Sequence, residues 1–149
     1  MKNIIFFLSL ILSSISFAQI CNTQIYKEPV LIGRAGKSKL SYPVLELIKG
    51  KNANVYAITY QNAKYEFTDL KTITFTASDD ELDLLYSFFE EGLYSDKDRS
   101  IDIGSNKINT SLYRKGFEMI FVSHSDGTEG YFMLNPKQLR LLFDKTVEK

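Results

Sequence analysis

Thiol, imidazole and indole side chains are scarce in this sequence, which holds one Cys, one His and no Trp in 149 residues. One Cys excludes an internal disulfide framework and every zinc or iron–sulfur site built from several thiolates. One His likewise excludes a His-rich metal site. An excess of basic charge is missing too, because 18 Lys and Arg residues balance 18 Asp and Glu residues. Such a balance disfavours a protein built around a nucleic-acid backbone.

Long hydrophobic runs are confined to the N-terminus. Lys2 precedes an apolar run over residues 4–12, and Ser16 and Ala18 place small side chains at the two positions that a signal peptidase reads. The run is too short for a membrane-spanning helix, which needs about 20 residues. We therefore expect a cleavable secretory signal peptide over residues 1–18, no transmembrane segment in the mature chain, and a periplasmic or extracellular protein.

Cys21 lies just after the expected cleavage site. A lipoprotein signal needs small residues before its Cys, whereas Gln19 and Ile20 precede this one. An odd Cys in an exported protein is otherwise a free thiol, or it pairs with a second chain. Three states of Cys21 therefore stay open, namely free, paired and lipidated.

A pattern recurs 57 positions apart, where residues 75–86 match residues 132–143. In each copy an aromatic residue is followed three positions later by a capping residue, Ser78 or Asn135, and then by a Glu or Gln after three more. This spacing predicts capping boxes at the starts of two amphipathic helices. Gly92 predicts a left-handed cap at the end of the first helix.

Upstream of each helix the apolar residues alternate with polar ones, which predicts strands. The expected strands are 43–48, 55–60, 64–67 and 72–76 in the first half, with an additional strand at 24–32 before them, and 100–103, 107–114, 117–123 and 128–133 in the second half. We therefore expect an α+β fold in which antiparallel sheets and two helices form tandem units of four strands and a helix. The approximate units are 40–95 and 99–149, within a single exported domain at 19–149. They should share one core, because one short helix on a four-stranded sheet buries little.

The offset of 57 also aligns Tyr56 with Tyr113 and Tyr60 with Phe117, and these aromatic residues suggest an open sheet face that binds a ligand. It aligns Asp69 with Asp126, which we expect to initiate turns rather than to act as paired catalytic carboxylates. The candidate binding residues are Tyr56, Tyr60, Lys64, Tyr113, Arg114, Lys115 and Phe117.

Two successive units of four strands and a helix resemble the PUR-repeat and Whirly-type single-stranded nucleic-acid binders. Residues 60–64 (Tyr-Gln-Asn-Ala-Lys), followed by Phe67, look like the strand-turn-strand segment of a PUR repeat. The resemblance implies the fold, and a basic sheet with stacking aromatic residues as the binding surface. The chain departs from the pattern at Tyr65 and Glu66, where PUR repeats favour Gly and a basic residue.

Three short motifs suggest chemistry that their surroundings do not support. The run 33–38 lacks the first Gly of a phosphate loop and precedes an expected strand instead of a helix. The run 96–102 spaces oxygen atoms as a calcium loop does, but it lacks the turn Gly and the bidentate acid. Residues 123–126 bring hydroxyls, a base and a carboxylate together, yet neighbours on a strand point to opposite faces. Within that run, His124 is the one side chain that ordinarily titrates near neutrality.

The leading interpretation is a non-catalytic exported module that binds a protein or an envelope component, through an exposed sheet face or as a homodimer. It requires no cofactor and no metal. One alternative is binding of single-stranded nucleic acid by the sheet, involving Lys64, Arg114 and Lys115. The other is a small hydrolase that depends on His124. An open aromatic face would favour ligand binding or dimerisation, whereas a covered face would direct attention to the loops.

Overall fold

The computed structural model describes residues 28–39, 42–50, 53–65 and 68–145. The expected signal peptide, Cys21 and the beginning of the strand expected at 24–32 lie outside the described residues. Within the described part of the chain, neither helix has the length and apolar character needed to cross a membrane.

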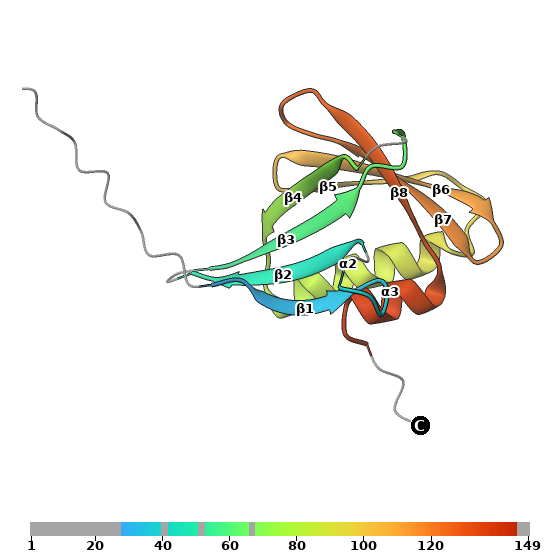
Figure 1. The fold of residues 1–149 in the computed structure, drawn as a ribbon. Coiled ribbons are helices and arrows are strands. Elements are labelled where there is room, and N and C mark those ends of the chain that lie inside the picture. The colour runs from blue at the N-terminus through green and yellow to red at the C-terminus, as the bar shows by residue number, and fades with distance from the viewer. Residues whose placement is uncertain (1–27, 40–41, 51–52, 66–67, 146–149) are drawn as a thin grey trace, which may run out of the picture.

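Two antiparallel four-stranded sheets, each followed by a helix, make up the structure (Figure 1). The first unit contains β1 (Val30–Arg34), β2 (Val44–Lys49), β3 (Asn54–Gln61), β4 (Leu70–Thr76) and α2 (Asp79–Gly92). The second unit contains β5 (Arg99–Ile103), β6 (Asn106–Arg114), β7 (Phe117–Ser123), β8 (Glu129–Leu134) and α3 (Pro136–Leu142). In each sheet the strands lie in sequence order. The predicted α+β fold of repeated strand–helix units is confirmed.

Two details of the predicted first sheet are wrong. The strand expected at 24–32 is not additional, because β1 is the first of the four strands. The strand expected at 64–67 does not form at Lys64 and Tyr65, which lie in a turn and a bend, and residues 66–67 are outside the described residues. The cause is Asn62, whose side-chain Oδ1 accepts a hydrogen bond from the Lys64 amide at 3.2 Å and turns the chain away from β3.

Both predicted helix starts are confirmed as capping boxes. The amide of Ser78 donates to Glu81 Oε2 at 2.8 Å, and the amide of Glu81 donates to Ser78 Oγ at 3.3 Å. Asn135 and Gln138 make the same reciprocal pair, with both distances 3.0 Å. Side chains thus satisfy backbone groups that the first helical turn would leave unpaired.

The units share one core, because each helix packs against a strand of the other unit. Helix α3 lies against β1, and α2 lies against β6 (Figure 1). One buried apolar cluster contains side chains from both sheets and both helices. Gly33 on β1 shows how close α3 comes, since a Cβ atom there would overlap the carbonyl oxygens of Leu141 and Leu142. Gly33, in the run that suggested a phosphate loop, therefore serves helix packing.

The predicted alignment of aromatic residues at an offset of 57 does not follow the topology. Tyr56 lies on the third strand of the first sheet, whereas Tyr113 lies on the second strand of the second sheet. The offset holds for the last strand and the helix of each unit, but the connection between β3 and β4 is longer than the hairpin between β7 and β8. Residues before these connections are consequently shifted out of correspondence.

Gly92 does not form the left-handed cap that its position predicted. It belongs to the last turn of α2, where the C-cap residue Leu93 has a right-handed helical conformation. Its lack of a side chain has a different use, because the carboxyl group of Glu118 on β7 lies directly against it. A Cβ atom at position 92 would overlap Glu118 Oε1.

Gly92→Ala should therefore destabilise the fold, by about 1–3 kcal/mol for an overpacked contact. In an ordinary helix the same change stabilises by roughly 1 kcal/mol, so the sign of the effect is the test. The measurement is the free energy of unfolding in urea, with the exposed helical change Ser87→Ala as a near-neutral control. A Gly92→Ala protein more stable than wild type would contradict the close contact with Glu118.

Candidate functional site

The first unit is joined to the edge of the second sheet by Asn62, Ala63 and Tyr131, which we call the Asn62–Tyr131 clasp. The Ala63 amide donates to the Tyr131 carbonyl at 2.9 Å, and the Tyr131 amide donates to Asn62 Oδ1 at 3.1 Å. The Tyr131 hydroxyl also donates to the Ala63 carbonyl, at 3.2 Å. The clasp therefore satisfies the backbone groups of Tyr131 that point away from β7.

Asn62 is held rigidly and is fully buried. Its Nδ2 donates to Asp69 Oδ2 at 2.9 Å, and its amide donates to the Asp69 carbonyl at 2.8 Å. Gly130 makes the crossing of β3 and β8 possible, because a Cβ atom there would lie 2.6 Å from the Tyr60 hydroxyl and 3.1 Å from Asn62 Cγ. A side chain at position 130 would push the two units apart.

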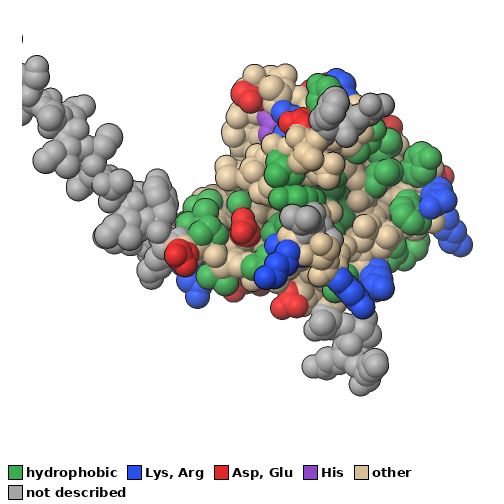
Figure 2. Space-filling view, in the orientation of Figure 1, with side chains coloured by type: hydrophobic (Ala, Val, Ile, Leu, Met, Phe, Trp, Pro, Cys, Tyr) green, Lys and Arg blue, Asp and Glu red, His purple; other side chains and the backbone are tan. Residues whose placement is uncertain are grey.

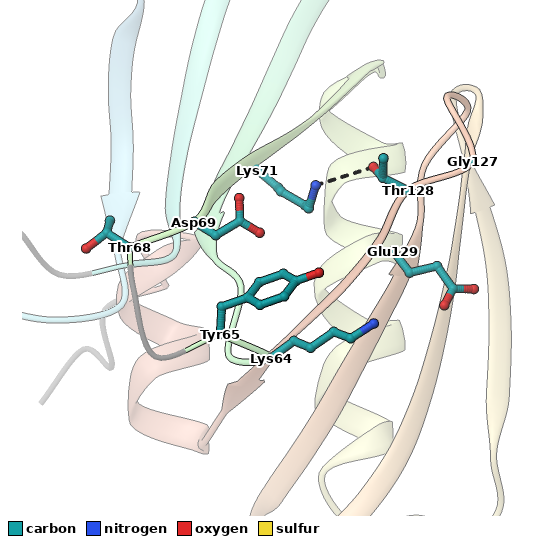
Figure 3. A pocket seen from close by; sticks show the side chains of 8 residues that line it. All are labelled: Lys64, Tyr65, Thr68, Asp69, Lys71, Gly127, Thr128 and Glu129. Carbon is teal, nitrogen blue, oxygen red and sulfur yellow. Dashed lines mark hydrogen bonds between the residues drawn. The ribbon is translucent and has the colours of Figure 1, made fainter.

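An open groove of about 670 Å³ lies beside the clasp, and we call it the inter-unit groove (Figure 3). It is lined by Lys64, Tyr65, Thr68, Asp69 and Lys71 from the first unit and by Gly127, Thr128 and Glu129 from the second. Lys71 Nζ reaches across it to donate to Thr128 Oγ1 at 3.4 Å. Because two Lys residues face two acidic residues, the groove is polar but carries no single sign of charge.

His124 neighbours this groove and is paired with Tyr60. The Tyr60 hydroxyl and His124 Nε2 lie 2.8 Å apart in a hydrogen bond, and the two rings stack with centroids 6.0 Å apart. Partial burial lowers the pKa of His124, and the charge of Lys71 lowers it further against an opposing effect of Asp126. Burial raises the pKa of Tyr60. At neutral pH His124 is therefore an uncharged imidazole.

Asp126 initiates the β7–β8 turn, as predicted. Its Oδ1 accepts hydrogen bonds from the amide and the hydroxyl of Thr128, at 2.8 and 2.7 Å. Gly127 next to it has a φ of +80°, which suits the turn. The side chain of His124 thus hydrogen-bonds to a buried phenol, while the nearby carboxylate is bound to the turn. This geometry does not align a hydroxyl nucleophile with a base.

Two of the predicted binding residues lie inside the core. Tyr60 is fully buried, and Tyr56 stacks on Phe75 while its hydroxyl donates to Asp79 Oδ1 at 3.2 Å. Both point from β3 toward the helices and the second sheet, because this face of the first sheet is its covered face. Neither side chain is available on an exposed sheet surface.

The remaining predicted residues lie in two places. Tyr113, Arg114, Lys115 and Phe117 come together around the β6–β7 turn, where the Arg114 guanidinium lies 4.2 Å from the centroid of the Phe117 ring. Lys64 lies apart from them, in the inter-unit groove. The structure therefore divides the predicted set into a buried pair, a cluster at one end of the second sheet, and one groove residue.

The outer face of the second sheet carries an apolar group that sequence reasoning missed. We call it the outer-face cluster, formed by Met119 and Phe121 on β7 and by Tyr131 and Met133 on β8. Met119 lies opposite Met133, and Phe121 lies opposite Tyr131 with ring centroids 5.7 Å apart. Phe121 is 38% exposed and Met133 is 41% exposed. Figure 2 shows hydrophobic side chains beside Lys and Arg over the β6–β7 end of this sheet.

A sequence pattern could have revealed this face. Along β7 the outward set contains Phe117, Met119 and Phe121, while the inward set contains Ile120 and Val122 together with Glu118. A strand whose outward positions are apolar lacks the polar face of an ordinary exterior strand. The first sheet differs, because its outward positions on β3 and β4 are rich in threonine, at Thr59, Thr72, Thr74 and Thr76.

No protein-family model, curated protein or solved structure matches the chain. Among the residues that the structure describes, no three His, Cys, Asp or Glu side chains are grouped as ligands for a metal ion. The outer-face cluster and the group of residues at the β6–β7 turn are the surfaces that bear on function.

One carboxyl group beneath the outer-face cluster is strongly perturbed. Glu118 points inward from β7, is fully buried, and neither of its carboxyl oxygens has a hydrogen-bond partner. Burial raises its pKa to about 7, although the neighbouring hydroxyl of Thr110 and the charge of Arg99 act in the opposite direction. Glu118 is therefore largely protonated below neutral pH.

The pKa of His124 can be tested through Lys71. Lys71→Gln should raise the pKa of His124, because it removes a positive charge that disfavours the imidazolium, whereas Asp126→Asn should lower it further. The chain has one His, so a proton NMR titration of the ring follows it without ambiguity. Lys64→Gln, on the same groove, is the control and should leave the titration unchanged. Equal responses to Lys71→Gln and Lys64→Gln would show that Lys71 does not act on His124.

The raised pKa of Glu118 predicts a specific loss of stability with pH. The folded state binds the Glu118 proton more tightly than the unfolded chain does. The stabilisation that this proton adds to the folded state therefore falls as pH rises from 4.5 to about 7, and does not change above that. The total is about 3 kcal/mol by linkage. Glu118→Gln should remove this fall. The free energy of unfolding of the variant in urea should therefore rise relative to that of wild type between pH 4.5 and 7. Glu28→Gln is the exposed control, and a parallel pH profile for Glu118→Gln and wild type would refute the shift.

Proposed function

We propose that the chain is an exported, non-catalytic interaction module that binds another protein through the outer-face cluster of its second sheet. The observation that carries this proposal is the open apolar face formed by Met119, Phe121, Tyr131 and Met133. Both described helices pack on the inner side of the sheets, so neither covers this face. Contiguous exposed apolar side chains of this kind mark docking surfaces in soluble proteins.

The composition of the face fits a protein ligand. Methionine and aromatic side chains are enriched in the cores of protein interfaces, where they adapt to the partner and bury large areas. Around the cluster lie uncharged Asn109 and Ser111 on β6, with Lys107 and Glu129 at one end of the sheet. An apolar centre with a polar rim is the usual arrangement of a non-obligate interface.

Export is part of the proposal and is supported by the N-terminal sequence. Lys2, the short apolar run and Ser16 and Ala18 together have the pattern of a cleavable signal peptide. An extracellular or periplasmic setting places the module among envelope and secreted proteins.

Single-stranded nucleic acid is a second candidate ligand, favoured by the cluster at the β6–β7 turn. Exposed Tyr113 offers a ring for base stacking, and Arg114 and Lys115 supply positive charge beside it. The burial of Tyr56 and Tyr60 removes two of the rings on which that interpretation depended. Retention of an oligonucleotide at low salt, lost in Arg114→Ala and Lys115→Ala, would support this candidate.

Capture from an envelope and secreted fraction tests the interaction module. Immobilised wild-type chain should retain protein from this fraction, including untagged copies of itself. The double variant Phe121→Ser, Met133→Ser should retain none, because its outer face is polar. Leu70→Ser is the matched control, since Leu70 is 45% exposed on an edge strand of the other sheet. Retention that is absent, or that survives the outer-face change, would refute the proposed docking surface.

A further inference from the structure

We infer that the partner of the outer-face cluster is the same face of a second copy of this chain, related to the first by a two-fold axis parallel to β7. This inference rests on the proposed function, because it names the occupant of the same surface. A two-fold axis makes a surface contact itself, so the face must be complementary to its own rotated image.

The charges at one end of the second sheet are arranged asymmetrically. Lys107 on β6 lies opposite Ser123 on β7, which in turn lies opposite Glu129 on β8. With Asp102 on β5 opposite Lys107, the whole row reads negative, positive, neutral and negative, and the two strands that flank β7 carry opposite charges. Lys107 and Glu129 are both exposed, and neither forms an ion pair within the described chain.

An axis parallel to β7 exchanges the two sides of this row. It places β6 of each copy over β8 of the other. The dimer therefore contains two pairs in which Lys107 of one copy faces Glu129 of the other. An axis in the sheet plane but perpendicular to the strands would place Lys107 over the opposite end of β6, which carries Arg114. Charge complementarity thus selects the axis parallel to the strands.

The same axis buries the outer-face cluster. Met119 and Phe121 lie on β7 and meet their own images across the axis. Tyr131 and Met133 on β8 lie over Asn109 and Ser111 of the second copy, whose smaller uncharged side chains leave room for them. Two sheets packed face to face in this way form the ordinary core of a β-sandwich.

A third charged residue, Asp102, lies in the same row across the sheet. Asp102 on β5 lies opposite Lys107 and shares the outer face. Rotation about β7 carries Asp102 beyond β8 of the second copy, where Lys64 lines the inter-unit groove together with Glu129. Asp102 therefore meets a groove of mixed charge, in which Lys64 and Lys71 accompany Asp69 and Glu129, and the selection of the axis rests on the pairing of Lys107 with Glu129.

Charge reversal tests this dimer and its axis. Sedimentation of the chain purified from the exported fraction, in reducing buffer so that Cys21 cannot link copies, should show a concentration-dependent dimer. Lys107→Glu and Glu129→Lys should each raise its dissociation constant by roughly tenfold, because each dimer then contains two repulsive pairs. Phe121→Ser should abolish it.

An equimolar mixture of Lys107→Glu and Glu129→Lys chains should regain the dimer as a heterodimer. In that mixture the introduced carboxylate faces the introduced ammonium, and the retained Lys107 faces the retained Glu129. Both pairs are again opposite in sign. Folding of the two variants is checked by their unchanged unfolding midpoints.

A wild-type chain that stays monomeric at every concentration overturns the inference, and capture that still depends on Phe121 and Met133 then leaves the proposed function standing with a different partner. A wild-type dimer whose charge-reversed variants fail to recover on mixing overturns the assigned axis. Only recovery of the dimer in the mixture supports the two-fold contact through the outer face.

Discussion

The hydrogen bonds between Asn62, Ala63 and Tyr131 are the constraint on which the arrangement of the two units depends. Each sheet has one apolar face that must be buried, and the clasp sets where β3 meets the edge of β8. Asn62 can be buried at this crossing because four hydrogen bonds satisfy it, two of them with Asp69. Gly130 permits the close approach. The inter-unit groove, the Tyr60–His124 pair and the orientation of the second sheet all follow from this one junction.

The outer faces of the two sheets differ in polarity. The first sheet turns threonines outward, whereas the second turns outward Met119, Phe121, Tyr131 and Met133. Because both helices pack on the inner side of the sheets, neither covers the second face, which Ala63 of the first unit borders at Tyr131. Its apolar surface is thus a property of the assembled fold.

Burial also overrides local preference at the contact between α2 and β7. Gly92 at the end of a helix suggests a left-handed cap, but here it stays helical and makes room for a carboxyl group. A charged residue ordinarily faces solvent, but Glu118 points inward with Ile120 and Val122, and its carboxyl oxygens lack a hydrogen-bond partner. The two exceptions explain each other, since a side chain at position 92 would collide with Glu118. A buried carboxyl group next to a helix end favours its proton, which couples this packing to pH.

The sequence by itself determined the repeated order of strands and helices, the capping boxes at Ser78 and Asn135, and the turn at Asp126, because these depend on contacts between near neighbours in the chain. Only the tertiary structure decided that Tyr56 and Tyr60 are buried, that Lys64 begins a turn, and that the outer-face cluster is open. Those outcomes depend on which face of each sheet the other unit covers, and residues 69 positions apart, such as Asn62 and Tyr131, set it. Local patterns carry no information about such pairs, so the candidate site was only partly predictable.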